Sequence, residues 1–71
     1  MTEEQTARVG EILGEATRRP REWVNIPGSG CRVRVNPRDD VAVFVFQDKD
    51  DIVQFTRDVS HIVKLIKENL S

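Results

Sequence analysis

The stretch that decides the fold runs from Arg21 to Asn36 and reads REWVNIPGSGCRVRVN. Two short segments rich in β-branched residues, 22–26 and 31–36, flank the tetrapeptide PGSG at 27–30. Pro and Gly supply the restricted backbone angles that a chain reversal needs. The stretch therefore predicts a β-hairpin. Its one Trp and three Arg raise the question whether the hairpin carries an arginine-rich binding surface.

A third strand is indicated by VAVFVFQ at 41–47, which follows the turn-forming tetrapeptide PRDD at 37–40. Two consecutive short connections predict an antiparallel meander with 31–36 in the middle. Before the meander, four apolar residues recur at helical spacing and predict a first helix over 2–17. Thr2 and Gln5 resemble a capping box at its start, and Pro20 ends it. Gly10 and Gly14 share one face of this helix. They are interpreted as tolerated surface positions, with close approach of another backbone as the alternative.

The last segment predicts a helix of about 20 residues, capped by Asp50 or Asp51 and continuing to the C-terminus. Its apolar positions at helical spacing are Ile52, Phe55, Val59, Ile62, Val63, Ile66 and Leu70. The predicted fold class is therefore α+β, with element order α-β-β-β-α in one domain spanning residues 1–71. A short N-terminal helix precedes a three-stranded antiparallel meander, and a long C-terminal helix packs on one sheet face.

Four-residue turns at PGSG and PRDD predict the strand register, with Val24 opposite Val33 and Val33 opposite Phe44. Directly opposed residues share a sheet face. One face is then wholly apolar and is expected to pack on the long helix: Val24, Ile26, Cys31, Val33, Val35, Ala42, Phe44 and Phe46. The other face is mixed, with Trp23, Asn25, Arg32, Arg34, Val41, Val43 and Val45. An ordinary solvated face does not need a tryptophan and three valines.

Two structural interpretations of the mixed face remain open. The first helix covers part of it, with Val9, Ile12 and Leu13 packing on the valines and the arginine stems around the rim, or a second subunit buries its final strand. In the second case the final strand, 41–46, is an apolar edge that a partner pairs with or buries. The favoured function is a small non-catalytic protein–protein interaction module that self-associates, most simply as a homodimer. Its expected interaction face is Trp23, Asn25, Arg32, Arg34, Val43 and Val45.

Nucleic-acid binding is the alternative, because an aromatic ring can stack on a base while arginines meet phosphates. The candidate contacts are Arg18, Arg19, Arg21, Trp23, Arg32, Arg34 and Arg38. The chain has 11 basic and 12 acidic residues, so it is not a polycation, although its centre is basic between acidic flanks. A single aromatic residue on the face and the acidic DKDD at 48–51 make this alternative less favoured.

Composition excludes several other classes of protein. One Cys and one His cannot form the usual four-ligand zinc site, and PGSG joins two strands, unlike a phosphate-binding loop. Cys31 is expected in the core and His61 has no catalytic companion, so neither an enzyme nor a cofactor is expected. The absence of a long apolar run or a signal peptide indicates a cytoplasmic protein that does not cross a membrane. At 71 residues the core is small, which favours stabilisation by oligomerisation.

Overall fold

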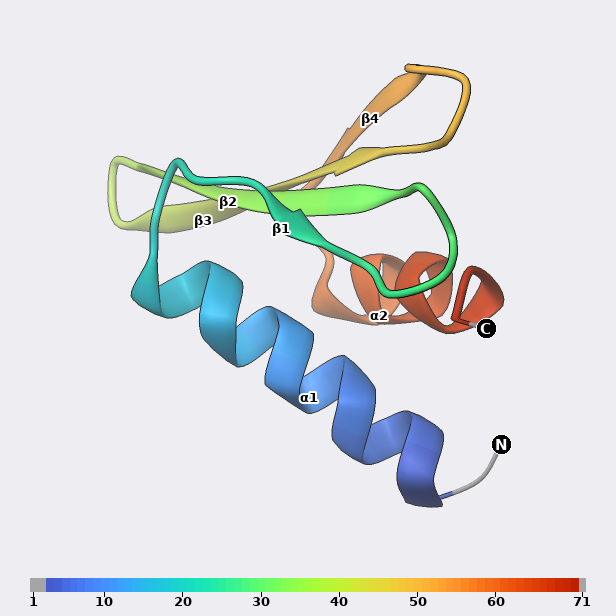
Figure 1. The fold of residues 1–71 in the computed structure, drawn as a ribbon. Coiled ribbons are helices and arrows are strands. Elements are labelled where there is room, and N and C mark those ends of the chain that lie inside the picture. Colours follow the sequence, from blue (N-terminus) through green and yellow to red (C-terminus); the bar gives the residue numbers. More distant parts are fainter. Residues whose placement is uncertain (1–2, 71) are drawn as a thin grey trace.

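The computed structural model describes residues 3–70 and contains two helices and one four-stranded antiparallel sheet. The elements along the chain are α1 (Glu3–Arg18), β1 (Val24–Asn25), β2 (Arg32–Arg38), β3 (Val41–Gln47), β4 (Val53–Thr56) and α2 (Val59–Glu68) (Figure 1). The predicted α+β class is confirmed. The predicted three-stranded sheet and long final helix are wrong, because a fourth strand occupies the start of the expected helix.

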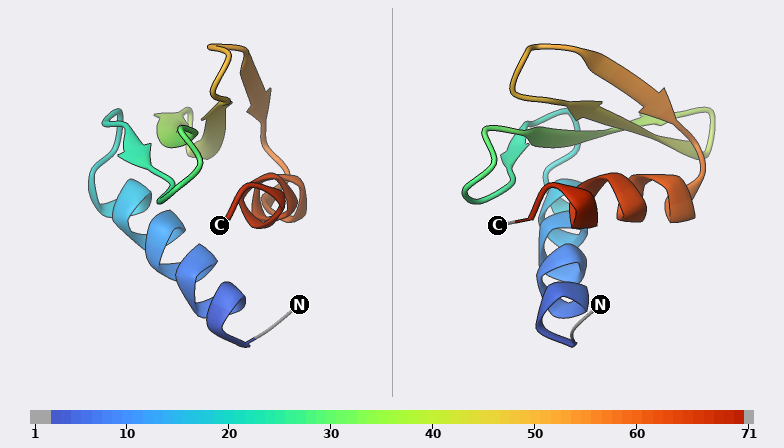
Figure 2. Two further views of the ribbon diagram at one scale, coloured as in Figure 1. Left: turned by 45° about the vertical axis from the view of Figure 1, so that its right-hand side comes forward. Right: turned by 90° about the vertical axis from the view of Figure 1, so that its right-hand side faces the viewer.

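The strands lie in the order β1-β2-β3-β4, and both helices lie on the same side of the sheet (Figures 1 and 2). The fold is thus a two-layer arrangement with one sheet face covered and the other free of helices. The interpretation in which the first helix covers the mixed face is therefore wrong. Strand β3 is also not an edge, since β4 pairs along it, and the two edges of the sheet are β1 and β4.

The β1–β2 hairpin has the predicted register, with Val24 opposite Val33. The Ile26 amide donates to the Cys31 carbonyl at 2.8 Å, which closes the hairpin around PGSG. Gly28 and Gly30 have φ angles of 76° and 75°, a region that residues with a Cβ atom rarely occupy. The glycines in this turn are therefore required by the backbone path.

The β2–β3 turn is tighter than predicted, because Pro37 and Arg38 belong to β2 and only two residues reverse the chain. Asp39 and Asp40 both have positive φ, 49° and 66°, as the mirror-image turns of two-residue hairpins require. Val33 consequently lies opposite Phe46, two residues from its predicted partner. A shift of two residues returns each side chain to the same sheet face, so the predicted division of this hairpin into an apolar and a mixed face survives.

Strand β4 forms where the sequence pattern predicts a helix. The Asp48 carboxylate accepts the amides of Asp50 and Ile52 at 2.8 and 3.0 Å, and Asp51 has a φ of 65°. These features make a tight turn that sends the chain back along β3. The sequence VQFT at 53–56 then alternates apolar and polar residues, and its β-branched and aromatic side chains favour a strand.

Helix α2 begins at Val59, with Asp58 as its N-cap in place of Asp50 or Asp51. The Asp58 carboxylate accepts the Ser60 amide at 2.9 Å and so satisfies one of the free donors at the helix start. Only the later part of the predicted apolar stripe is therefore helical. Ile62 and Ile66 from that part are fully buried against the sheet.

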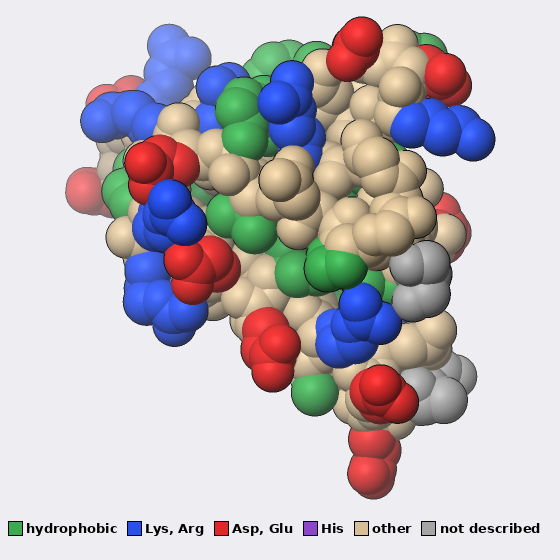
Figure 3. Space-filling view, in the orientation of Figure 1, with side chains coloured by type: hydrophobic (Ala, Val, Ile, Leu, Met, Phe, Trp, Pro, Cys, Tyr) green, Lys and Arg blue, Asp and Glu red, His purple; other side chains and the backbone are tan. Residues whose placement is uncertain are grey.

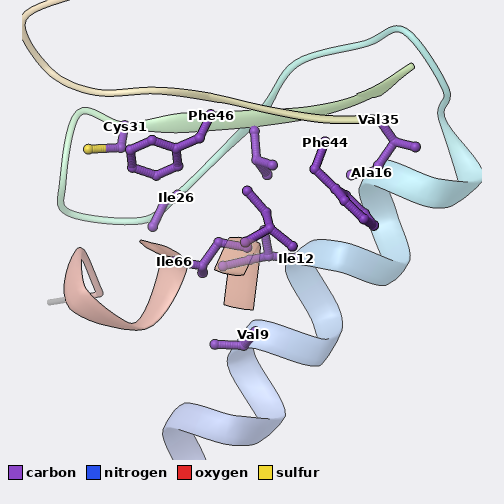
Figure 4. Packing of buried hydrophobic residues seen from close by; sticks show 11 residues of the cluster. Val9, Ile12, Ala16, Ile26, Cys31, Val35, Phe44, Phe46 and Ile66 are labelled. Atoms are coloured by element: carbon purple, nitrogen blue, oxygen red, sulfur yellow. The ribbon is translucent and has the colours of Figure 1, made fainter. Parts of the chain in front are cut away.

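The hydrophobic core lies between the sheet and both helices (Figure 4). Helix α1 contributes Val9, Ile12 and Ala16, which meet the inward side chains of the strands and of α2. The other buried members are Ile26, Cys31, Val33, Val35, Phe44, Phe46, Ile62 and Ile66. Cys31 is a free, buried cysteine, as expected from its place in the hairpin.

The glycines of α1 do not mediate a close backbone contact. A Cβ atom at Gly10 would meet nothing within 4 Å, and one at Gly14 would meet only the Arg18 side chain at 3.8 Å. Both are tolerated helix positions, as favoured from the sequence. Thr2, the expected partner in a capping box, lies outside the described residues.

Gly10→Ala is expected to stabilise the fold by about 0.5–1 kcal/mol, because Ala loses less backbone entropy in a helix and the added methyl group enters open space. Gly30→Ala is the opposing variant. It is expected to destabilise by about 1 kcal/mol or more, since its φ is +75° and the new Cβ would lie 3.4 Å from the Lys49 Cβ. Urea denaturation followed by circular dichroism measures both. Equal effects of the two variants would contradict these backbone assignments.

Candidate interaction face

The sheet face opposite the helices is the candidate site and is called the uncovered face below. Side chains alternate along a strand, and Val33, Val35, Phe44 and Phe46 point into the core. The intervening residues and their cross-strand partners therefore point the other way. On this face lie Asn25, Arg32, Arg34, Asn36, Val43, Val45, Gln47, Val53 and Phe55.

Trp23 lies on this face in a stack with two arginines. The guanidinium carbons of Arg32 and Arg34 lie 4.8 and 4.5 Å from the centre of the indole ring. At these distances the positive charges are attracted by the electron-rich ring face. The Arg34 Nε atom is buried and makes no hydrogen bond with any of the described residues, so the ring is the contact that holds this guanidinium.

Val45 is fully buried even though no helix covers its side of the sheet. Its cross-strand neighbours are Arg34 on β2 and Phe55 on β4. The stems of long basic side chains can cover apolar surface while their charged ends stay in water. The Trp–Arg stack thus forms a small second layer over the central strands. It shields the part of the uncovered face nearest β2.

A hydrogen-bonded chain ties this layer to the β3–β4 turn. The Arg32 Nε donates to the Gln47 Oε1 at 2.6 Å, and the Gln47 Nε2 donates to the Asp51 Oδ1 at 2.9 Å. Arg32 is therefore held both by the indole ring and by a side-chain amide. This chain gives the uncovered face a defined polar border beside Val53, the cross-strand partner of Gln47.

The arginines at the end of α1 are already paired with acids. Arg18 and Arg19 form ion pairs with Glu15 at 2.7 and 3.3 Å, and Arg19 also pairs with Glu22 at 3.0 Å. Hydrogen bonds from Arg18 and then Arg19 lower the pKa of the Glu15 carboxyl, while Glu22 and then Glu15 raise the pKa of Arg19. Arg21 and Arg38 are exposed. Basic and acidic side chains accordingly alternate over this part of the surface (Figure 3).

The structure thus places Trp23, Asn25, Arg32, Arg34, Val43 and Val45 on one sheet face, and leaves Arg18 and Arg19 on the helix end. Sequence analysis missed Val53 and Phe55, which are 41% and 66% exposed on β4. The sequence pattern places Phe55 in the apolar stripe of a helix. The alternation of Val53 and Phe55 with Gln54 and Thr56 was the signal for a strand, but the same residues also fit helical spacing.

A second feature is a hollow of about 350 Å³ between the β1–β2 turn, the β3–β4 turn and the end of α2, lined by Ser29, Cys31, Asp48, Lys49, Asp50, Glu68, Asn69 and Leu70. The Cys31 thiol there lies 3.6 Å from the Asn69 Oδ1 and 3.8 Å from the Ser29 carbonyl. Neither neighbour is a base that could activate it. Within residues 3–70, no group of three His, Cys, Asp or Glu side chains is arranged to hold a metal ion.

Comparison with protein-family models, with curated proteins and with solved structures finds no match for this chain. Neither of the helices described between residues 3 and 70 is long and apolar enough to cross a membrane. A functional assignment must therefore be built from the uncovered face itself.

The Trp–Arg stack predicts an energetic coupling between Trp23 and Arg34. A double-mutant cycle with Trp23→Leu and Arg34→Met is expected to give a coupling of about 0.5–1 kcal/mol in the free energy of unfolding, measured by urea denaturation. The matched control is Arg38→Met, which removes an exposed arginine of the same strand that does not lie over the ring. Equal coupling of Trp23 to Arg38 and to Arg34 would show that the stack has no specific stabilising role.

Proposed function

We propose that this protein is a small, non-catalytic interaction module that self-associates through the uncovered face and its β4 border. The observation that carries the proposal is Phe55, which is 66% exposed on the helix-free side of the sheet, in an edge strand. Burying a phenylalanine side chain is worth about 1.5–3 kcal/mol, and in the isolated chain most of this gain is forgone. A second copy of the chain supplies the missing cover.

Phe55 belongs to a contiguous patch of apolar side chains and is not an isolated exposed residue. Val53 precedes it on the same face and is 41% exposed, and Val43 is half-buried on the adjacent strand. Scattered exposed hydrophobic residues are common on monomers, whereas contiguous ones rimmed by polar groups mark interfaces. Here the polar rim is made by Arg32, Gln47 and Asp51.

The interaction face expected from the sequence is kept in this proposal with two changes. Trp23, Asn25, Arg32 and Arg34 remain its polar and aromatic part, and Val43 remains one of its apolar members. Val45 becomes a buried support, and Val53 and Phe55 become the apolar part. A non-catalytic role is supported by the buried Cys31 thiol, whose hydrogen-bond partners among the described residues are an amide oxygen and a backbone carbonyl, neither of which is a base.

Nucleic-acid binding through the same arginines has less support. The Trp23 ring already holds two guanidinium groups, so it is not a free platform for a base. Arg18 and Arg19 form ion pairs with Glu15 and Glu22. Of the candidate arginines outside the Trp–Arg stack, this leaves Arg21 and Arg38 exposed and available to a phosphate. Titration with single- and double-stranded oligonucleotides at low salt, where phosphate contacts are strongest, tests this second candidate.

Phe55→Glu is expected to convert a self-associated protein to a monomer, because it places a charge in an apolar contact. The measurement is solution mass by light scattering over a concentration series from about 10 μM to about 1 mM, a range suited to an interface of modest size. Ala7→Glu is the control, since it adds the same charge at an exposed position of α1. A wild-type mass equal to one chain throughout the series would rule out the proposed self-association.

A further inference from the structure

Strand β4 combines an uncharged centre with oppositely charged ends. Residues Val53–Thr56 contain no charge and no proline, and Asp51 and Arg57 lie three residues before and three residues after Gln54. Natural edge strands are normally protected by charges, proline or bulges within the strand. Arg57 is exposed and forms no ion pair with any residue between 3 and 70. Strand β4 is therefore an unprotected edge, and the residues that flank its two ends carry opposite charges.

The free backbone groups of β4 are those of Val53 and Phe55. The Asp48 amide donates to the Ile52 carbonyl at 3.0 Å, which makes these two residues a hydrogen-bonded pair at the start of the β3–β4 ladder. Hydrogen-bonded and non-hydrogen-bonded pairs alternate in an antiparallel ladder. Gln54 therefore bonds to β3, whereas Val53 and Phe55 direct their N–H and C=O groups away from the sheet.

From these features we propose that two copies of the chain pair their β4 strands antiparallel about a two-fold axis at Gln54. The inference rests on the proposed self-association and confines its contact to the β4 border, where Val53 and Phe55 meet the partner subunit, whereas Trp23, Arg32 and Arg34 lie beside the other edge of the sheet. Val53 then forms a hydrogen-bonded pair with Phe55 of the partner subunit, through the backbone groups that point outward. Asp51 of each copy lies opposite Arg57 of the partner subunit. The Asp51 Oδ1 already accepts a hydrogen bond from Gln47, and its second oxygen is left for this contact.

Charge and side-chain pairing select this register over its neighbours. A shift of two residues one way places Phe55 opposite the partner's Phe55 and leaves Arg57 opposite a valine. A shift the other way places Val53 opposite the partner's Val53 and Asp51 opposite a phenylalanine. The Gln54-centred register alone pairs opposite charges, and it also pairs an aromatic with a β-branched side chain on one sheet face. Both kinds of cross-strand pair are stabilising.

Pairing at the β4 edge also fits the charges better than stacking of two uncovered faces. A two-fold stack centred on the middle of these faces would bring Arg32 and Arg34 of both copies together, and like charges across an interface are strongly unfavourable. The other edge of the sheet, β1, is only two residues long. In the β4 pairing the four strands of each copy join into one eight-stranded sheet, with all helices on the same side.

Disulfide trapping with Gln54→Cys tests the register. At the two-fold axis this position faces itself in a non-hydrogen-bonded pair, with Cα atoms about 4.5 Å apart, which suits a disulfide. Thr56→Cys is the matched control, because in this register its two copies are separated by about 14 Å along the strands. Gln54→Cys is expected to form a covalent dimer under mild oxidation, and Thr56→Cys and the unsubstituted protein, whose Cys31 is buried, are not.

Arg57→Glu provides a second test that adds no thiol. It places a glutamate opposite the partner's Asp51, and the dimer is expected to dissociate about tenfold more readily at low salt, with a smaller difference at high salt. Lys64→Glu makes the same charge change at an exposed position of α2 and is expected to leave the dissociation constant unchanged.

The outcomes separate this geometry from the proposed function. A wild-type protein that stays monomeric refutes both. If the wild-type protein is a dimer that Phe55→Glu disrupts, the proposed self-association stands. The β4 register is then overturned if Gln54→Cys does not cross-link, or if Thr56→Cys cross-links equally well. The register is supported if Gln54→Cys forms a covalent dimer and Thr56→Cys does not, and if Arg57→Glu weakens the dimer and Lys64→Glu does not.

Discussion

The strict alternation of strand β2 is the constraint on which the rest of the structure depends. Val33 and Val35 point to one side of the sheet, and Arg32 and Arg34 point to the other. The valines are almost fully buried and form the floor on which both helices pack. Because a buried guanidinium without a partner is costly, the arginine side cannot receive a helix in the same way. The fold therefore has two layers, one of strands and one of helices, and the second face of the sheet carries no helix.

The open face is only partly a solvated surface. The indole ring of Trp23 and the two guanidinium groups above it form a local cover, and Val45 beneath this cover is as inaccessible as the residues of the main core. The cover does not extend to β4, where Phe55 stands in solvent. The Arg32–Gln47–Asp51 chain borders both halves at the end of the sheet where β3 turns into β4. One half of this face is therefore covered by its own side chains, and the other half leaves apolar side chains in solvent. The proposed function belongs to the second half.

Sequence reasoning was most successful where patterns were local and unambiguous. The α+β class, the β1–β2 register and the division of β2 and β3 into two faces all follow from period-two alternation and turn residues. One error arose from the β2–β3 turn. Pro37 and Arg38 look like turn residues but end a strand, since Asp39 and Asp40 both adopt positive φ and reverse the chain alone. The resulting shift of two residues left each face unchanged.

The larger error concerned 52–56, where an apolar pattern fits both a helix and a strand. The spacing of Ile52, Phe55 and Val59 is helical, and several aspartates nearby could serve as an N-cap. Contacts that the pattern does not encode favour the strand over the helix. The Asp48 carboxylate accepts hydrogen bonds from two amides at the turn, and β3 offers an edge with which residues 53–56 pair. The apolar half of the candidate site was missed for this reason.

The two-residue turn at Asp39–Asp40 also has a consequence for the order of folding. It joins strands that form seven consecutive residue pairs, so the longest ladder of the protein closes through its shortest hairpin loop. The entropy lost on closing a loop rises with its length, and contacts between near neighbours in sequence form fastest. We therefore expect this hairpin to be structured in the folding transition state. Helices α1 and α2 would then condense later on the valine side, which kinetic analysis of Val33→Ala and Ile62→Val can establish.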